Sequence, residues 1–237
     1  LYSAITRINN PGVNIMTIED PVEYEIKGIT QVQVNREAGL TFASAMRSFL
    51  RQDPDIIMVG EIRDQETAEL AIQASLTGHL VFSTLHTNQA AGTIPRLLDL
   101  GAEPFLLASS LSLVVGQRIA RRICPNCREE YQPDKTSLDE LSAVLGKFLP
   151  KKKEEIKFFR GKGCEQCNNT GYYGRVGIFE VLSVSEKIVK LILERAPAIE
   201  IEKQAVEEGM ITMLQDGYLR VVEGVSTMEE VVRVVRD

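Results

Sequence analysis

Four cysteines form two Cys-x-x-Cys pairs, and the 237-residue chain holds no others: Cys124, Cys127, Cys164 and Cys167. Two thiolates in one tight turn can occupy two corners of a tetrahedron about 2.3 Å from a zinc ion, and a second pair closes the shell. A closed shell leaves no open position, which is typical of a structural metal. Two disulfides or four unrelated thiols are the alternatives, and the lack of an export signal disfavours disulfides. The pattern therefore predicts Zn²⁺ bound by all four sulfurs.

Three apolar segments that read as strands end in polar residues. Glu19 and Asp20 close "MTIEDP", Glu61 closes "DIIMVGE", and His86 follows "FSTL". In a parallel sheet the carboxyl ends of the strands face one crevice, so we expect these side chains to share it. The second segment is similar to a Walker B strand, whose acid helps to hold Mg²⁺ on a nucleotide. A strand ending in a solvated glutamate would explain that motif alone, but the three segments together favour a nucleotide site.

Basic side chains occur near the same segments. Arg47 and Arg51 are four residues apart, hence on one face of a predicted helix, and Arg63 follows the second strand. Guanidinium groups can bind phosphate oxygens in a bidentate manner, although pairing with nearby aspartates at the surface is the simpler explanation. The two histidines of the chain, His79 and His86, flank one predicted strand, and this placement favours contact with phosphate.

Strands and helices alternate from residue 1 to about residue 118, as in a parallel sheet covered by helices. Short apolar, β-branched runs predict strands, and runs with helical periodicity predict helices. The predicted strands are 13–19, 30–34, 55–61 and 79–87, and the predicted helices are 1–8, 41–52, 64–78 and 88–101.

The second half of the chain has a different character. Residues 121–175 hold both cysteine pairs and many turn residues, and after a strand at 174–184 the sequence predicts short amphipathic helices. We therefore expect an α/β protein in three parts. These are a nucleotide-binding core at 1–120, a four-cysteine zinc-binding insertion at 121–175, and a C-terminal strand with a helical bundle at 176–237.

Composition limits the possible partners. The net charge is −6 and the pI is about 5.2, which argues against nucleic acid as a bulk electrostatic partner. The one basic run, Lys151–Lys153, is better explained as a solvated loop or a contact with anionic lipid. No apolar run approaches the roughly 20 residues that span a bilayer.

The three segments together resemble the sequence boxes of the secretion ATPase superfamily. "MTIEDPVEY" is similar to its Asp box, "DPDIIMVGEIRD" to its Walker B box and "LTGHLVFSTLHTN" to its His box. Within that superfamily the chain is most similar to the type II secretion and type IV pilus assembly ATPases, of which the four-cysteine insertion is typical. The resemblance extends from Leu1 to about Val235. It implies a RecA-like fold, ATP and Mg²⁺ as ligands, and ATP hydrolysis by the parent protein.

The resemblance also implies roles for individual residues. Glu19, with Asp20 beside it, matches the acid that activates the attacking water, and Glu61 matches the acid that positions Mg²⁺. His86 matches a residue near the γ-phosphate, with His79 as its partner. The arginines that match positions serving the phosphates or subunit contacts are Arg47, Arg51, Arg63 and Arg96.

For the parent protein the resemblance implies a homo-hexamer in the cytoplasm, peripheral to the inner membrane. There it acts with an integral membrane platform protein and a cytoplasmic adaptor to push pilin-like subunits into a fibre. One departure is that the sequence holds no G-x-x-x-x-G-K-[ST] loop, which in the family precedes a segment like "LYSAITRI". We therefore expect a C-terminal fragment that begins just after the P-loop lysine and is inactive alone. The alternative is a catalytically inactive, zinc-stabilised module that joins or regulates such a ring.

Overall fold

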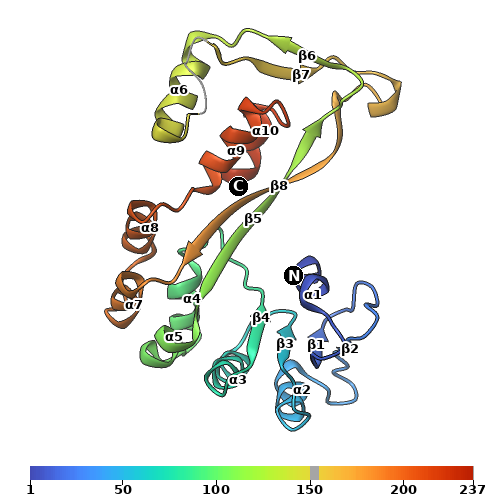
Figure 1. Cartoon of the computed structure of the whole chain (residues 1–237), viewed down its shortest axis with the longest axis vertical. Helices are drawn as coiled ribbons and strands as arrows, with labels where there is room; N and C mark the ends of the chain where they lie inside the picture. Colours follow the sequence, from blue (N-terminus) through green and yellow to red (C-terminus); the bar gives the residue numbers. More distant parts are fainter. Residues whose placement is uncertain (150–154, 237) are drawn as a thin grey trace. The chain divides into compact units, whose positions relative to one another are not determined.

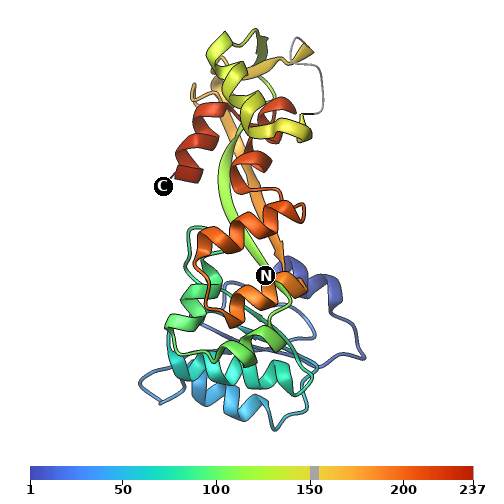
Figure 2. The ribbon, with the colours of Figure 1, turned by 90° about the vertical axis from the view of Figure 1, so that its left-hand side faces the viewer.

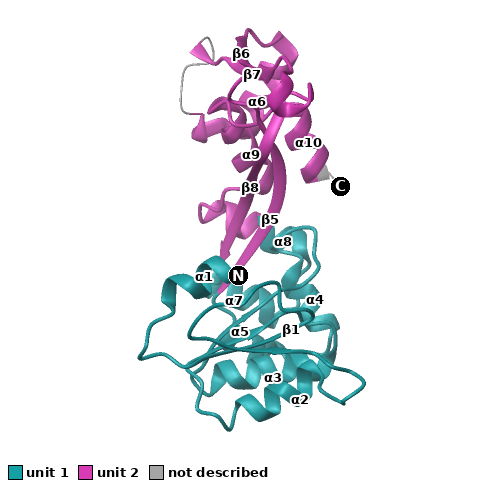
Figure 3. Ribbon diagram, turned by 90° about the vertical axis from the view of Figure 1, so that its right-hand side faces the viewer, with its two compact units in different colours: residues 1–112, 184–202 teal, residues 113–183, 203–237 magenta. Residues whose placement is uncertain are grey.

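The computed structural model describes residues 1–149 and 155–236. These residues form two compact units, each built from two segments of the chain (Figure 3). Unit 1 comprises Leu1–Ser112 and Val184–Glu202, and unit 2 comprises Leu113–Ser183 and the chain from Lys203 onward. The polypeptide therefore passes between the units at three points.

Unit 1 is built on a four-stranded parallel sheet in the order β2-β1-β3-β4 (Figure 1). Its strands are β1 (Ile15–Glu19), β2 (Thr30–Gln33), β3 (Ile56–Val59) and β4 (Leu80–Ser83). Every residue of β1 and β3 is buried, as expected for central strands with both faces covered. The parallel α/β architecture predicted from the sequence is confirmed, and the four carboxyl ends lie along one edge.

Different helices cover the two faces of this sheet. Helix α1 (Tyr2–Ile8) covers one face through a cluster that contains Ile5, Ile15 and Met58. Helices α2 (Phe42–Phe49) and α3 (Gln65–Leu76) cover the other face. Both begin at a residue whose side chain accepts a hydrogen bond from the first turn, as N-caps do. These caps are Thr41, at 3.1 Å from the amide nitrogen of Ser44, and Asp64, at 2.8 Å from the amide nitrogen of Thr67.

Further helices complete unit 1. They are α4 (Thr93–Asp99), α5 (Pro104–Ser110), α7 (Glu186–Leu193) and the first residues of α8 (Ala198–Glu207). Helix α4 begins later than the helix predicted at 88–101, so Pro95 lies in its first turn, where a missing N–H leaves no helical bond unmade. Helix α5 contacts both α3 and α7.

Unit 2 is built on a long antiparallel ribbon of β5 (Leu113–Ile123) and β8 (Tyr172–Ser183). Its side chains alternate between two faces. Ala120 and Ile178 on one face are buried in a cluster with α9 (Met213–Val222) and α10 (Met228–Arg236), which lie along the ribbon in Figure 2. The remaining elements are β6 (Arg128–Tyr131), which pairs with β7 (Phe158–Gly161), and α6 (Lys135–Leu145), η1 (Gly146–Phe148) and η3 (Glu165–Cys167).

The two units differ from the three parts expected at 1–120, 121–175 and 176–237, because β5 and β8 pair along their length and unite residues 113–183. The expected C-terminal bundle is divided. Helix α7 buries Ile188 and Ile192 in unit 1, whereas α9 and α10 belong to unit 2. The sequence patterns also missed α5 and β5. Lys151–Lys153 lie outside the described residues. No helix in the described ranges has both the length and the apolar character needed to cross a bilayer.

Candidate functional site

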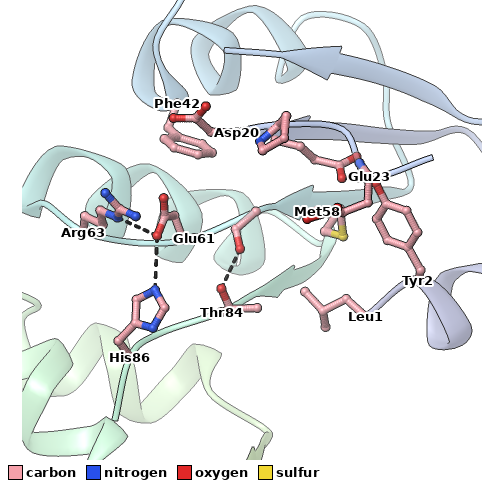
Figure 4. Close-up of a pocket in the computed structure, with 13 residues that line it drawn as sticks. Leu1, Tyr2, Asp20, Glu23, Phe42, Met58, Glu61, Arg63, Thr84 and His86 are labelled. Carbon is pink, nitrogen blue, oxygen red and sulfur yellow. Dashed lines mark hydrogen bonds and ion pairs between the residues drawn. The ribbon is translucent and has the colours of Figure 1, made fainter. Parts of the chain in front are cut away.

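A pocket of about 410 Å³ opens at the carboxyl ends of β1, β3 and β4 in unit 1 (Figure 4). It brings together Glu19, Asp20, Glu61 and His86, which follow three different strands in the sequence. The parallel arrangement explains this convergence, since all three strands deliver their last residues to one edge. The other lining residues are Leu1, Tyr2, Pro21, Glu23, Phe42, Met58, Gly60, Arg63 and Thr84.

Glu61 is the centre of a charged group in this pocket. Arg63 donates a hydrogen bond from Nε to Glu61 Oε2 at 2.5 Å, and His86 Nε2 lies 3.4 Å from the same oxygen. The Glu61 side chain is 12% exposed, whereas that of His86 is 83% exposed. One carboxylate is therefore held from two sides by groups that can carry positive charge, and the histidine is open to a ligand.

Gly60 allows the strand ends to approach closely. A Cβ atom at this position would lie 3.2 Å from the carbonyl oxygen of Ile18 and 3.3 Å from the Cα of Glu19. The carbonyl oxygen of Gly60 accepts a hydrogen bond from Thr84 Oγ1 at 2.6 Å, which ties the end of β3 to the segment after β4. Gly60 therefore fixes the spacing between the strand ends that carry Glu19 and Glu61.

Glu19 is buried at the end of β1 and is bound by three donors. Tyr2 donates its hydroxyl proton to Oε2, while Thr17 Oγ1 at 2.5 Å and Gln31 Nε2 at 3.1 Å donate to Oε1. Burial, followed by the hydrogen bond to Glu19, raises the pKa of Tyr2 above its usual value. Asp20 is exposed by comparison and lies 3.5 Å from Arg36. A cis peptide bond joins Asp20 to Pro21.

Four of the residues predicted for the nucleotide site do not line this pocket. His79 precedes β4, so it lies at the opposite edge of the sheet, where its Nδ1 is 2.8 Å from the carbonyl oxygen of Ala74. Arg47 pairs with Glu66 of α3, and Arg51 donates to the carbonyl oxygen of Arg47 at 2.7 Å. The fourth residue is Arg96, exposed on α4.

Sequence patterns missed the donors that surround Glu19. Thr17 and Gln31 are partners in the β1–β2 register, which places them side by side on the face that α1 covers. The alternation of "TQVQV" places Gln31 on a defined face of a strand, and this signal could have identified it as a neighbour of Glu19. Nothing in the helical pattern of residues 1–8 distinguishes Tyr2 from a tyrosine that only packs.

The four cysteine sulfurs of unit 2 lie within 4.8 Å of one another. The sulfur separations are 3.8 Å for Cys124 and Cys164, 3.9 Å for Cys127 and Cys167, and 3.7 Å for Cys164 and Cys167. Four thiolates around a zinc ion at about 2.3 Å form a tetrahedron with edges of about 3.8 Å. The sulfurs therefore have the spacing that a single tetrahedral metal requires.

Donors surround these sulfurs as well. Amide nitrogens of Cys164 and Gly171 lie 3.2 and 3.3 Å from Cys167 Sγ, and Asn126 Nδ2 lies 3.4 Å from Cys164 Sγ. The hydrogen bond from Asn126 contributes most to lowering the pKa of Cys164 to about 6. A lowered pKa favours the thiolate form of Cys164, which is the form that binds metal, whereas burial raises the pKa of Cys127 to about 12.

Comparison with known proteins identifies relatives over the whole chain. A family model described as "Type II/IV secretion system protein" matches residues 1–233. The type IV pilus assembly ATPase PilB of Myxococcus xanthus is 47% identical over 98% of this chain, and the type II secretion system ATPase E of Vibrio cholerae is 46% identical over 100% of it. The chain spans 40% and 46% of the lengths of these two relatives.

Two solved structures share the fold of this chain. The pilus retraction motor PilT with bound ADP matches 98% of this chain and 55% of its own chain, with 29% identity and a TM-score of 0.67. The ATPase DotB of Legionella pneumophila matches 97% of this chain and 54% of its own, with a TM-score of 0.64. Its identity of 22% makes the second match a likeness of fold alone.

Proposed function

This chain belongs to the type II/IV secretion system protein family, and we propose that it forms the Asp-box, Walker B and His-box side of an ATP-hydrolysing site. The whole protein that contains it would be a motor for assembling pilin-like fibres, in type II secretion or in type IV pilus extension. The similarity to PilB and to the type II secretion system ATPase E supports this proposal. The observation that carries it is the convergence of Glu19, Glu61 and His86 in one pocket.

The residues of the pocket suit phosphoryl transfer to water. That reaction needs an oriented water and groups that neutralise a triphosphate, with little covalent work for the protein. We assign to Glu19, with Asp20 beside it, the orientation of the attacking water. His86 and Arg63 act on the phosphate oxygens, because both are exposed beside Glu61 and offer N–H donors.

The carboxylate of Glu61 fits a magnesium ion. Mg²⁺ prefers oxygen ligands, and this carboxylate lies at a strand end where a nucleotide phosphate can approach. When bound, the ion would neutralise charge on the β- and γ-phosphate oxygens. Arg63 and His86 orient the Glu61 carboxylate, since both contact its Oε2 atom.

We propose that the cysteine cluster holds Zn²⁺ as a structural metal. The tetrahedral spacing of the sulfurs and their amide donors support this assignment. Four protein ligands leave no position for a substrate, so the ion would stabilise unit 2 and take no part in hydrolysis.

The whole protein is proposed to be a homo-hexamer in the cytoplasm, peripheral to the inner membrane. Its partners would be an integral membrane platform protein and a cytoplasmic adaptor, with no role for nucleic acid. Arg47, Arg51 and Arg96 lie outside the pocket, so we propose subunit contacts for these three arginines and a structural role for His79.

The test is ATP hydrolysis by the whole protein, with Glu61→Gln as the variant. This substitution keeps the shape and removes the charge, so kcat should fall by about a hundredfold or more. Glu37→Gln, an exposed change on the same unit, is the matched control. Unchanged turnover in Glu61→Gln would contradict the assignment.

The second candidate is an inactive, zinc-stabilised module that joins or regulates such a ring. It is favoured for residues 1–237 taken alone, because this sequence contains no G-x-x-x-x-G-K-[ST] motif. If the whole protein binds no ATP and still joins a ring of active subunits, this second function replaces the first.

A further inference from the structure

The two carboxylate oxygens of Glu19 are in different situations. Oε1 accepts from Thr17 Oγ1 at 2.5 Å and from Gln31 Nε2 at 3.1 Å. A carboxylate oxygen has about two acceptor positions, so Oε1 is saturated. Within the described residues Oε2 accepts from Tyr2 alone. One acceptor position on Oε2 therefore remains for a molecule in the pocket that Glu19 lines.

The hydrogen bonds around Tyr2 fix the direction of its proton. The Tyr2 hydroxyl oxygen accepts from the amide of Glu23 at 3.1 Å and lies 3.4 Å from Gln31 Nε2. Its single proton is therefore free to point at Glu19. The orientation of Gln31 is fixed as well, because its Oε1 accepts from the amide of Ile26 at 2.6 Å. Each member of the network has one arrangement that satisfies its partners.

The packing of unit 1 explains why these residues meet. Thr17 and Glu19 are two positions apart on β1, so they point to the same face, and Gln31 stands opposite Thr17 on β2. Helix α1 covers this face and places Tyr2 above it. The ring of Tyr2 packs edge-on against that of Tyr24, with 4.6 Å between ring centroids.

We propose that Tyr2 is a positioning residue for Glu19. Its hydroxyl holds Oε2 so that the open acceptor position of this oxygen faces the pocket, where it accepts a hydrogen bond from the attacking water. Tyr2 acts through Glu19 and needs no contact with the nucleotide. This inference rests on the proposed function, since it assigns a task to one of the proposed site residues.

The experiment is a double-mutant cycle in the whole protein with Tyr2→Phe, Glu19→Gln and their combination. Tyr2→Phe keeps the ring but removes a hydroxyl that bonds Glu19 and the amide of Glu23, so the melting temperature should fall slightly while the KM for ATP stays close to that of the wild type. Loss of orientation should lower kcat by about tenfold. In the Glu19→Gln background the same change should have no further effect on kcat, because the group on which Tyr2 acts is already altered.

Tyr24→Phe is the matched control. It removes the hydroxyl of the neighbouring, 59% exposed tyrosine and should leave kcat unchanged. A wild-type kcat in Tyr2→Phe overturns the inference, and so does a loss that adds fully to that of Glu19→Gln or appears only in KM. If the wild-type protein does not hydrolyse ATP, or Glu19→Gln retains full activity, the proposed function itself has failed.

Discussion

At the scale of single residues, the two histidines differ more in position than their sequence spacing suggests. His86 lies beside Glu61 in the pocket, whereas His79 lies near the end of α3. We predict that His86→Asn in the whole protein lowers kcat for ATP by about tenfold or more and leaves the melting temperature unchanged. His79→Asn should instead cost about 1 kcal/mol of stability, because it loses the contact with the Ala74 carbonyl.

Steady-state ATPase assays and thermal melts of both variants check this pair. Each histidine serves as the control for the other, since the substitution is the same. Equal losses of kcat in the two variants would contradict the positions assigned here.

We predict that the stability of unit 2 falls in acid because of the buried carboxylate of Glu230. It is 1% exposed and accepts hydrogen bonds from Arg121 at 2.6 Å and from Arg233 at 2.7 Å. Burial alone would raise the pKa of Glu230, but the bonds from Arg233 and Arg121 together outweigh burial and lower it from 4.5 to about 2. Because the folded-state pKa lies below the unfolded-state value, this stabilisation is complete above about pH 4.5 and is lost as the pH falls towards 2.

Glu230→Gln should therefore remove most of this pH dependence and cost about 3 kcal/mol near neutral pH. Denaturant titrations near neutral pH and at about pH 3 measure both effects. Glu229→Gln, an exposed change one residue earlier, is the control. An equal pH dependence in wild type and Glu230→Gln would show that other carboxylates govern acid unfolding.

Residue types were sufficient to predict that Glu19, Glu61 and His86 meet, because each follows a strand of one parallel sheet. The spacing of Arg47 and Arg51 predicted a shared helix face but did not say which way that face points. The contact of Tyr2 with Glu19 depends on how α1 packs on the sheet, and no local pattern encodes that packing.

At the scale of elements, two turns bring the cysteines together. One joins β5 to β6 and the other, around η3, joins β7 to β8. The second turn closes so tightly that a Cβ atom on Gly161, at its start, would lie 2.1 Å from the carbonyl oxygen of Gly171, at its end. Glycine at Gly161 is therefore required by the contact, and the metal is expected to hold the two turns in place.

We predict one zinc ion per chain. Cys164→Ser should abolish binding and lower the stability of unit 2 by several kcal/mol, of order 5, because metal binding and folding are coupled in such loops. Metal analysis and thermal melts with and without a chelator test this. Glu165→Gln, in the same turn, is the control. A metal-free wild-type protein that melts at the same temperature with and without added zinc would contradict the prediction.

The β5–β8 ribbon explains why the two compact units differ from the three parts expected from the sequence. The two strands are separated by the chain from residue 124 to residue 171, and such distant pairing leaves no periodic signal. The outer face of the ribbon keeps apolar residues exposed, among them Val115, Ile119 and Phe179. Apolar residues therefore occur on both faces of β5, and the polar residues Gln117 and Arg118 are adjacent, so the strand lacks the strict alternation that predicts one.

At the scale of the whole molecule, the 237 residues supply strand-end acids without a glycine-rich phosphate loop. We predict that this chain alone turns over ATP at least about a hundredfold more slowly than the whole protein, because the backbone amides and lysine that bind the β- and γ-phosphates are missing. A coupled ATPase assay on both proteins at equal concentration tests this. Comparable turnover by the isolated chain would contradict it.

The alternation of strands and helices was enough to predict the sheet of unit 1, since each crossover is short and local. The division into two units was not predictable in the same way. It depends on which of α7, α8, α9 and α10 packs on which core, and all four have similar amphipathic sequences.

The three passages of the polypeptide between the units have a genetic consequence. Neither unit corresponds to one uninterrupted stretch of codons, so a single recombination event cannot exchange one for a homologous version without leaving a hybrid of both. We therefore expect the pair to be inherited together, and chimaeras joined at residue 112 to fold only when α7 comes from the same parent as α5, on which it packs.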